Sequence, residues 1–217
     1  MARHHRQDAG ESLTMQGLFS WSSKVAVFTA VMVAVGNGLS ALSIGLAKVG
    51  QVGLDLSHVA TFIAAIYGGP AIGFLTGLLG GIVPGIHFGP LGGLAWLGLI
   101  GLPIGKSLTG LTAGFLYNIL GVSRRSKPSL LTVPVVLASY VPECLFTIFF
   151  FLALVPLFLG PAPWLTASLL VSILVKAWIE VALMSIFLSA LTGNQGFTAF
   201  VSSFFTERKV RYTGVPA

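Results

Sequence analysis

Charged residues are scarce in this sequence: Asp, Glu, Lys and Arg together make up 8% of its 217 residues. An ordinary soluble domain carries about 25%, so most soluble enzymes are excluded. Hydrophobic residues make up 55%. That fraction also excludes disorder, because a disordered chain has few apolar residues and much charge. The composition predicts a single polytopic membrane domain, an all-α membrane protein.

Cysteine and catalytic motifs are nearly absent as well. Cys144 is the only cysteine, so no internal disulfide can form, and we interpret it as a small core residue. The spacing before Lys106 does not match the phosphate-binding pattern G-x-x-x-x-G-K-[ST], and no H-E-x-x-H, paired C-x-x-C or G-x-S-x-G motif occurs. We therefore expect no enzymatic activity, no cofactor and no bound metal. Energy for uphill transport would come from a partner or an ion gradient.

Acidic residues number six against twelve Lys and Arg, which gives a formal net charge of +6. Nine of the twelve basic residues fall into three clusters separated by long apolar stretches. The clusters are Arg3, Arg6 and Lys24; Arg124, Arg125 and Lys127; and Arg208, Lys209 and Arg211. Such positive charge is typical of the cytoplasmic flanks of membrane helices. We interpret it as an orientation signal, not as a site for nucleic acid.

The apolar runs predict six transmembrane helices in a compact bundle. Their ranges are 25–47, 56–67, 71–83, 103–120, 130–159 and 165–191. A sharp turn is expected at Gly69-Pro70. Pro134 and Pro142 are expected to kink the fifth helix. The glycine-rich residues 84–98, before the fourth helix, are expected to form an irregular or re-entrant stretch.

Six helices place both termini and the basic loop at 124–127 on one side. All three basic clusters then agree with a single orientation, in which both tails lie in the cytoplasm. We predict a cytoplasmic tail over residues 1–23, a transmembrane domain over 24–191 and a second cytoplasmic tail over 192–217. The expected location is the plasma membrane, with the chain crossing it several times.

Small residues recur at four-residue spacing, which places them on one helix face. In the first helix they are Ala26, Ala30, Ala34 and Gly38, and in the third they are Gly69, Gly73, Gly77 and Gly81. In lipid, such stripes let helices approach closely. We interpret the glycine stripe as internal packing. The alanine stripe is interpreted either as internal packing or as a surface that docks against another protein.

Ionisable and amide groups inside membrane helices are costly, so each needs a reason. The residues concerned are Asn37, Lys106, Glu143, Lys176 and Glu180. Helix rise places Glu143 and Lys176 at comparable depth, while Lys176 and Glu180 share a face. Three hypotheses stay open for these groups: a buried ionic network that fixes packing, a binding site for a polar or charged solute, and a proton relay. Lys106 either extends to the surface or faces a pocket.

Three further polar residues border the predicted outer surface: Asp55, His58 and His87. A metal site would need three or four ligands in fixed geometry, so these residues are weak candidates for one. Trp96 and Trp164 also fall at outer positions, where they form either an aromatic belt or a surface for stacking on a flat ligand.

Three segments of the sequence resemble a known family. They are the A-x-x-x-A pattern of residues 26–30, the aliphatic run followed by G-P-x-x-G-x-x-x-G over residues 62–77, and GKSLTGLTAG over residues 105–114. Together they resemble the substrate-binding membrane subunit, or S-component, of energy-coupling factor transporters for vitamins. The resemblance covers roughly residues 24–190, and the order of the segments is more specific than any one of them.

The resemblance implies a function and partners. An S-component captures a vitamin or similar micronutrient at the outer face and then docks on a transmembrane coupling subunit, while two cytosolic ATPase subunits drive the cycle. Ala26, Ala30 and Ala34 would then form the docking stripe. The pocket would include Lys106, Glu143 and Lys176, together with loops around Asp55 and His87. The alternatives are a stand-alone permease coupled to protons through Glu143 or Glu180, and a membrane scaffold without transport function.

Overall fold

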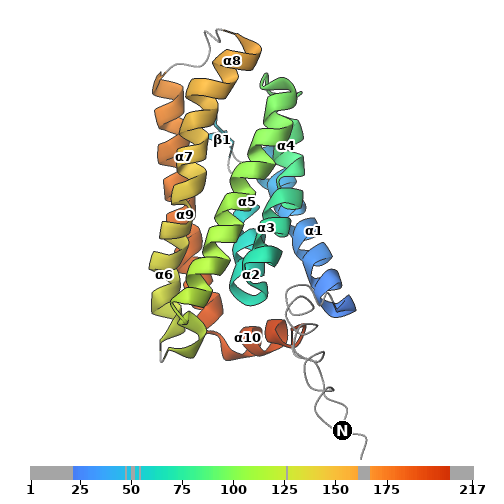
Figure 1. Ribbon diagram of the computed structural model, residues 1–217, viewed down its shortest axis with the longest axis vertical. Helices are drawn as coiled ribbons and strands as arrows, with labels where there is room; N and C mark the ends of the chain where they lie inside the picture. Colours follow the sequence, from blue (N-terminus) through green and yellow to red (C-terminus); the bar gives the residue numbers. More distant parts are fainter. Residues whose placement is uncertain are drawn as a thin grey trace, which may run out of the picture.

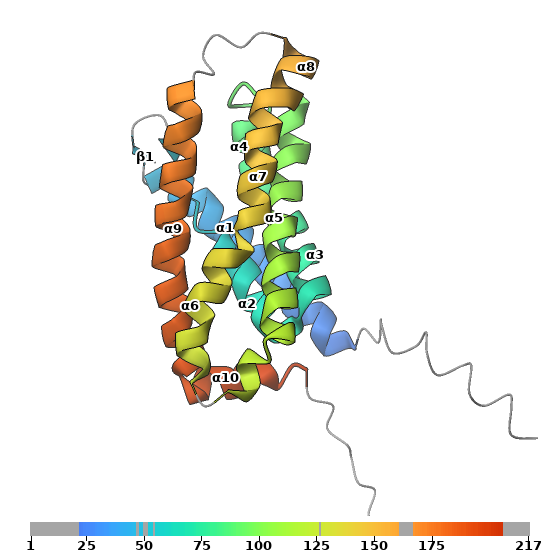
Figure 2. The ribbon, with the colours of Figure 1, turned by 60° about the vertical axis from the view of Figure 1, so that its left-hand side comes forward.

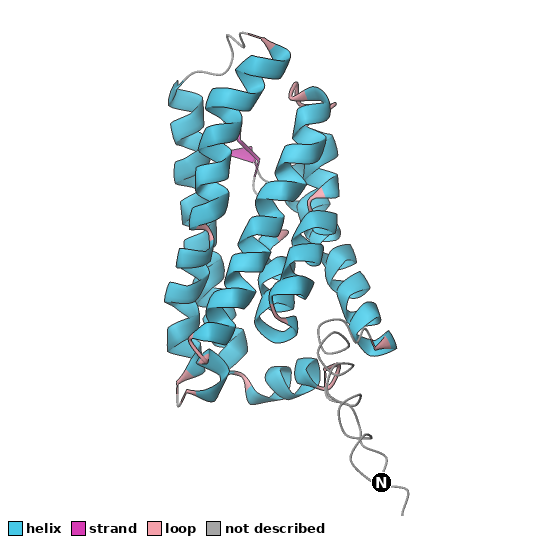
Figure 3. Ribbon diagram, viewed as in Figure 1, coloured by secondary structure: helices cyan, strands magenta, loops and turns pink. Residues whose placement is uncertain are grey.

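The computed structural model describes residues 22–46, 48–49, 52–53, 55–125, 127–160 and 167–205. Several predictions concern residues outside these ranges: most of both tails, the basic residues before Lys24, the basic cluster at 208–211, and Trp164. Within the described ranges the protein is a helical bundle with one very short pair of strands (Figures 1 and 3). The prediction of an all-α fold is confirmed for these residues.

The elements follow one another along the chain in a regular order. The helices are α1 (Ser23–Leu46), α2 (His58–Gly68), α3 (Pro70–Gly80), α4 (Ile82–Phe88), α5 (Ala95–Ile119), α6 (Pro128–Ser139), α7 (Val141–Phe149), α8 (Val155–Leu159), α9 (Ala167–Gly193) and α10 (Gln195–Ser202). A 3₁₀ turn covers Val122–Arg124, and a π-helical turn covers Phe150–Leu154. The strands β1 (Lys48–Val49) and β2 (Val52–Gly53) pair antiparallel between α1 and α2.

Among the described residues, five helical segments, not six, are long and apolar enough to cross a membrane. They are Ser23–Ile44, Pro70–Phe88, Ala95–Arg124, Pro128–Leu159 and Leu170–Gly193. The predicted second span is the exception, because α2 has only 11 residues. At about 1.5 Å per residue it rises roughly 16 Å, about half of a hydrocarbon core. In Figures 1 and 2 it occupies the lower half of the bundle.

The expectation of an irregular stretch at residues 84–98 is wrong over most of that range. Pro84 lies in the first turn of α4, where a missing N–H costs nothing because that N–H has no intrahelical partner. Only residues 89–94 form turns, and α5 then begins at Ala95 and continues through Pro103. Glycine and proline do not break these helices, because close packing against neighbours compensates for their weak propensity.

The predicted fifth span is interrupted at one of its two prolines. α6 ends at Ser139 and α7 starts at Val141, so that Pro142 lies in the first turn of the new helix. Pro142 has no backbone N–H to donate to Ala138 O, and its ring would clash with that carbonyl, which accounts for the break. α6 continues through Pro134, so this proline does not end the helix.

The glycine stripe packs inside the bundle, as predicted, and the structure shows that it holds α3 against α5. A Cβ added to Gly73 would overlap the backbone O of Gly110 in α5 and would also lie 2.6 Å from Ala65 Cβ in α2. One added to Gly81 would lie 2.6 Å from Pro103 Cα in α5. A Cβ on Gly77 would lie 2.9 Å from Ser107 Cα and would overlap the backbone of Lys106. These three positions therefore have no room for a side chain. The stripe holds the part of α5 that carries Lys106 directly against α3.

Helical structure continues beyond the predicted domain boundary at residue 191. α9 continues to Gly193, and α10 then begins at Gln195 after Asn194, whose side chain caps it by accepting from Phe197 N at 2.9 Å. α10 crosses one end of the bundle (Figure 1). Tyr67 Oη lies 3.0 Å from Thr198 Oγ1, so the start of the predicted tail is packed on the membrane domain.

One end of the bundle carries Lys24 and the basic loop at residues 124–127. α1 begins there with Lys24, and the α5–α6 connection with Arg124, Arg125 and Lys127 lies at the same end as α10 (Figures 1 and 2). We name it the basic end. Lys24 and the cluster at residues 124–127 thus lie at the same end, in agreement with the positive-inside rule.

Candidate functional site

Lys106 is the centre of a buried polar cluster half-way along α5. Its side chain is only 2% exposed. The ammonium Nζ lies 2.5 Å from Asp55 Oδ2 and 3.3 Å from His58 Nδ1, and it also donates to Ser57 Oγ. An ammonium has three N–H donors, and these three acceptors use all of them. The alternative in which Lys106 extends to the membrane surface is therefore wrong.

His58 connects Lys106 to Glu143. An ammonium only donates hydrogen bonds, so His58 Nδ1 acts as the acceptor and carries no proton. The proton of the neutral ring is then on Nε2, which lies 2.9 Å from Glu143 Oε2 and donates to it. The same carboxylate oxygen accepts from Thr109 Oγ1 at 2.5 Å. This contact lies three residues along α5 from Lys106, on the same face.

The short loop before α2 is held in place by its backbone N–H groups. Asp55 N donates to Glu180 Oε1 at 2.9 Å, and Leu56 N donates to Ser43 Oγ at 3.4 Å. Ser57 N donates to Asp55 Oδ1 at 3.0 Å, a side-chain turn typical of aspartate. Because α2 starts at mid-depth, this loop lies beside Lys106 instead of at the bundle end.

The charges of Asp55 and Lys106 stabilise one another. Burial acts to raise the pKa of Asp55, but the nearby Lys106 ammonium and the backbone N–H of Ser57 hold that pKa below its ordinary value. Asp55 is thus an anion at neutral pH. An isolated charge at this depth would be very costly, so the ion pair is needed for either partner to be buried.

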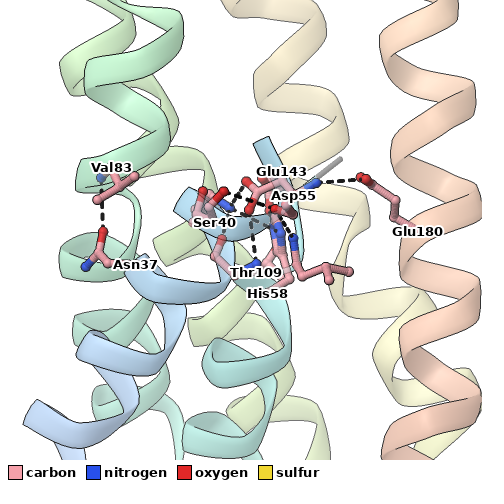
Figure 4. Close-up of polar contacts among 12 residues, drawn as sticks. Asn37, Ser40, Asp55, His58, Val83, Thr109, Glu143 and Glu180 are labelled. Atoms are coloured by element: carbon pink, nitrogen blue, oxygen red, sulfur yellow. Dashed lines mark hydrogen bonds and ion pairs between the residues drawn. The ribbon is translucent and has the colours of Figure 1, made fainter. Parts of the chain in front are cut away.

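Lys176 and Glu180 form the second ion pair, on α9. Their Nζ and Oε1 atoms are 3.1 Å apart, one helical turn from each other. The predicted Glu143–Lys176–Glu180 network is therefore correct only in its second half, because Glu143 binds His58 instead. In Figure 4, Glu180 reaches from α9 toward Asp55, while Glu143 meets His58 and Thr109. We name the ionic cluster by its eight members: Asp55, Ser57, His58, Lys106, Thr109, Glu143, Lys176 and Glu180.

A cavity of about 310 Å³ lies against the ionic cluster. Its polar wall consists of Asp55, His58, Thr147, Lys176 and Glu180. Its apolar wall consists of Phe88, Leu94, Leu102, Phe146, Phe150, Phe151, Ile173 and Ala177, and its glycines are Gly92, Gly101 and Gly105. A cavity with one charged wall and one aromatic wall is suited to a small molecule that has a charged head and an apolar body.

No protein-family model, curated protein or solved structure matches the chain. Functional interpretation therefore depends on the ionic cluster and its cavity. Among the described residues, no group of three or more His, Cys, Asp or Glu is placed to hold a metal ion. The arrangement places paired, solvent-shielded charges next to a cavity, which is suited to holding a small molecule.

Asn37 and His87 lie away from the ionic cluster. Asn37 joins α1 to the junction of α3 and α4: its Nδ2 donates to Leu79 O at 3.0 Å, and its Oδ1 accepts from Val83 N at 3.0 Å (Figure 4). The side chain thereby satisfies backbone groups near a helix break, which is a structural role. His87 lies in the last turn of α4 with its ring against Phe88, and it does not line the cavity.

The alanine stripe lies on the outside of the bundle. Ala26, Ala30 and Ala34 are all exposed, and a Cβ on Gly38 would meet nothing within 4 Å. α1 packs through another face, where Phe28 is 3% exposed. Of the two interpretations of this stripe, packing inside the described bundle is therefore excluded.

Sequence reasoning missed two members of the ionic cluster and misjudged a third. Ser57 and Thr109 were not candidates, and His58 was considered only as a weak metal ligand. The spacing of Thr109 from Lys106 was a usable signal, because residues three apart share a helix face. Nothing in the sequence placed His58 between two charged groups, since that depends on how α2, α5 and α7 meet.

Proposed function

We propose that this chain is a solute-binding membrane subunit of the S-component type, which captures a vitamin-sized micronutrient. The observation that carries the proposal is the cavity of about 310 Å³ beside the ionic cluster. Buried ion pairs are weak evidence for stability. A set of paired charges that borders an open volume has a clear use in holding a polar ligand.

The position of the cavity supports capture from the outside. Gly92 and Leu94 lie in the turn between α4 and α5, at the end of the bundle opposite the basic end (Figure 1). Excess positive charge marks the cytoplasmic side of membrane proteins. In this orientation, with the protein in the plasma membrane, the cavity faces outward. The predicted tails, residues 1–23 and 192–217, would then lie on the cytoplasmic side.

The exposed alanine stripe supports the proposed partners. Small side chains let a second helix approach closely, and in lipid this contact replaces hydrophobic association. On our proposal a transmembrane coupling subunit docks on Ala26, Ala30 and Ala34, and two cytosolic ATPase subunits supply the energy.

We expect the purified protein to carry its solute. Mass spectrometry of small molecules released by denaturing the protein would identify it. Uptake of that solute by cells should then require the coupling and ATPase subunits together with this chain. Folded protein that releases no solute, or uptake that is unchanged without the ATPase subunits, would contradict the proposal.

A second candidate is a stand-alone permease driven by protons, and one observation favours it. His58 joins the Lys106 ammonium to the Glu143 carboxylate, and such a chain can relay a proton. The two candidates differ in their energy source. If collapsing the proton gradient at constant ATP stops uptake by the chain alone, the permease is favoured over the S-component.

Ala30→Trp is expected to abolish uptake while leaving solute binding intact. The indole would prevent close approach of a coupling helix to the exposed stripe, whereas the residues that line the cavity all come from segments other than α1. Uptake in cells and binding by purified protein would be measured together. Ala138→Trp is the matched control, because Ala138 is an exposed alanine of α6. Equal uptake by both variants would contradict a docking role for the stripe.

A further inference from the structure

The described side chains of the ionic cluster do not balance in charge. Its carboxylates are Asp55, Glu143 and Glu180, and its ammonium groups are Lys106 and Lys176. The balance depends on His58, which is a cation only if both ring nitrogens carry protons. Because Nδ1 lies 3.3 Å from the Lys106 ammonium, that nitrogen accepts a hydrogen bond and the ring is neutral.

Each carboxylate is placed as an anion. Asp55 accepts from Lys106 and from Ser57 N, and Glu143 accepts from His58 and Thr109. Glu180 accepts from Asp55 N and pairs with Lys176. Three anions against two cations leave one negative charge on the described cluster. An uncompensated charge inside the membrane is costly, so a cation that enters the cavity would be stabilised there.

The place for such a cation is the Glu180 side of the cavity. All three donors of Lys106 are in use, so this lysine has no proton left for an anionic ligand. Both contacts described for Glu180 lie on Oε1, and its Oε2 is the acceptor that a ligand can address. Glu180 also borders the cavity.

The opposite wall favours an organic body over an inorganic ion. Phe88, Phe146, Phe150 and Phe151 line the cavity, and aromatic faces attract cations as well as apolar groups. A volume of about 310 Å³ is at the small end of sites for organic ligands and far exceeds one metal ion. We propose that the site takes a small organic cation, an amine or ammonium head on an apolar or aromatic body.

This inference rests on the proposed solute-binding function and specifies its ligand class. Three probes of one shape would test it: 4-phenylbutylamine, 4-phenylbutanol and 4-phenylbutyrate, titrated calorimetrically into the full-length protein in nanodiscs at neutral pH. We expect the amine to bind about tenfold more tightly than the alcohol, which corresponds to about 1.4 kcal/mol. The carboxylate should bind most weakly.

Two variants, one that removes an anion and one that removes a cation, make the test independent of any one substitution. Glu180→Gln should reduce the affinity for the amine to that for the alcohol. Lys176→Gln should widen the preference for the amine, because it removes a cation from the same wall. Four results would each overturn the ligand class. They are equal binding of amine and alcohol, tighter binding of the carboxylate, binding of none of the three probes, and a Lys176→Gln variant that prefers the alcohol. The solute released from purified protein and its ATP-dependent uptake test the binding function separately.

Discussion

Replacing Lys106 with methionine is expected to destabilise the protein by about 3–5 kcal/mol, the usual cost of removing one partner of a buried ion pair. Methionine retains the length of the side chain but leaves Asp55 charged without its cation, and it leaves Ser57 Oγ and His58 Nδ1 without their donor. The free energy of unfolding in mixed micelles would measure the loss. Bound solute should be lost as well, because the loop before α2 helps to form the cavity wall.

Two further variants separate charge pairing from general damage. Lys176→Met removes a lysine whose side chain is 19% exposed, compared with 2% for Lys106. It should therefore lower the free energy of unfolding clearly less than Lys106→Met does. Adding Asp55→Asn to Lys106→Met removes the orphaned charge and should restore part of the stability. If Lys106→Met and Lys176→Met were equally stable, or if the double variant recovered nothing, the pairing described for Lys106 would be refuted.

The Asp55–Lys106 pair also predicts how stability depends on pH. A carboxyl group whose pKa is lowered in the folded state contributes stability that is present above its unfolded pKa of about 3.9. That contribution is lost as pH falls below this value toward the folded pKa of Asp55. The stability advantage of the wild type over Asp55→Asn should therefore shrink on acidification below about pH 4.

Gly77→Ala is expected to be the second large effect, although it adds only one methyl group. That Cβ would overlap the backbone of Lys106 and approach Ser107 Cα to 2.9 Å. Neither contact can be relieved by a side-chain rotation, so α3 and α5 must separate. Overpacking of this kind costs about 1–3 kcal/mol. It should also weaken solute binding, because the same backbone positions the Lys106 ammonium.

Gly38→Ala provides the matched control for this prediction. Gly38 is also a helical glycine in a candidate membrane span, but its added Cβ would meet nothing within 4 Å. Alanine is the better helix former by about 1 kcal/mol, so this variant should be as stable as the wild type or slightly more so. Thermal unfolding of both variants in one detergent would compare them. A Gly77→Ala variant as stable as Gly38→Ala would rule out the tight α3–α5 contact.

Part of the site was predictable because membrane burial penalises charge regardless of the fold. Four charged residues each interrupt an apolar run: Lys106, Glu143, Lys176 and Glu180. Placing a charge inside a membrane helix costs free energy, so each of them could be expected to have a role. Lys176 and Glu180 could even be paired, because four-residue spacing places them one turn apart. The partner of Glu143 could not be predicted, since equal depth along two helices says nothing about which way each side chain faces.

The same distinction explains Asn37 and the glycine-rich segment. An amide inside an apolar helix indicates a hydrogen-bonding role, but its partners Leu79 and Val83 lie more than 40 residues away. Residues 84–98 looked irregular because glycine and proline have low helix propensity. Helix propensity predicts structure poorly where tight contacts between helices supply the stabilisation. α4 and α5 therefore form despite their glycine and proline residues.

Composition and residue spacing were enough to indicate apolar helices long enough to cross a membrane, a basic loop at 124–127, and close packing of α3 on a neighbour. These properties follow from composition and spacing, which act through solvent and through local geometry. Three features appear only in the folded bundle: α2 starts half-way along it, Asp55 and His58 meet Lys106 there, and a cavity remains beside them. Those features depend on the tilt and rotation of whole helices, which the packing of all of them fixes together.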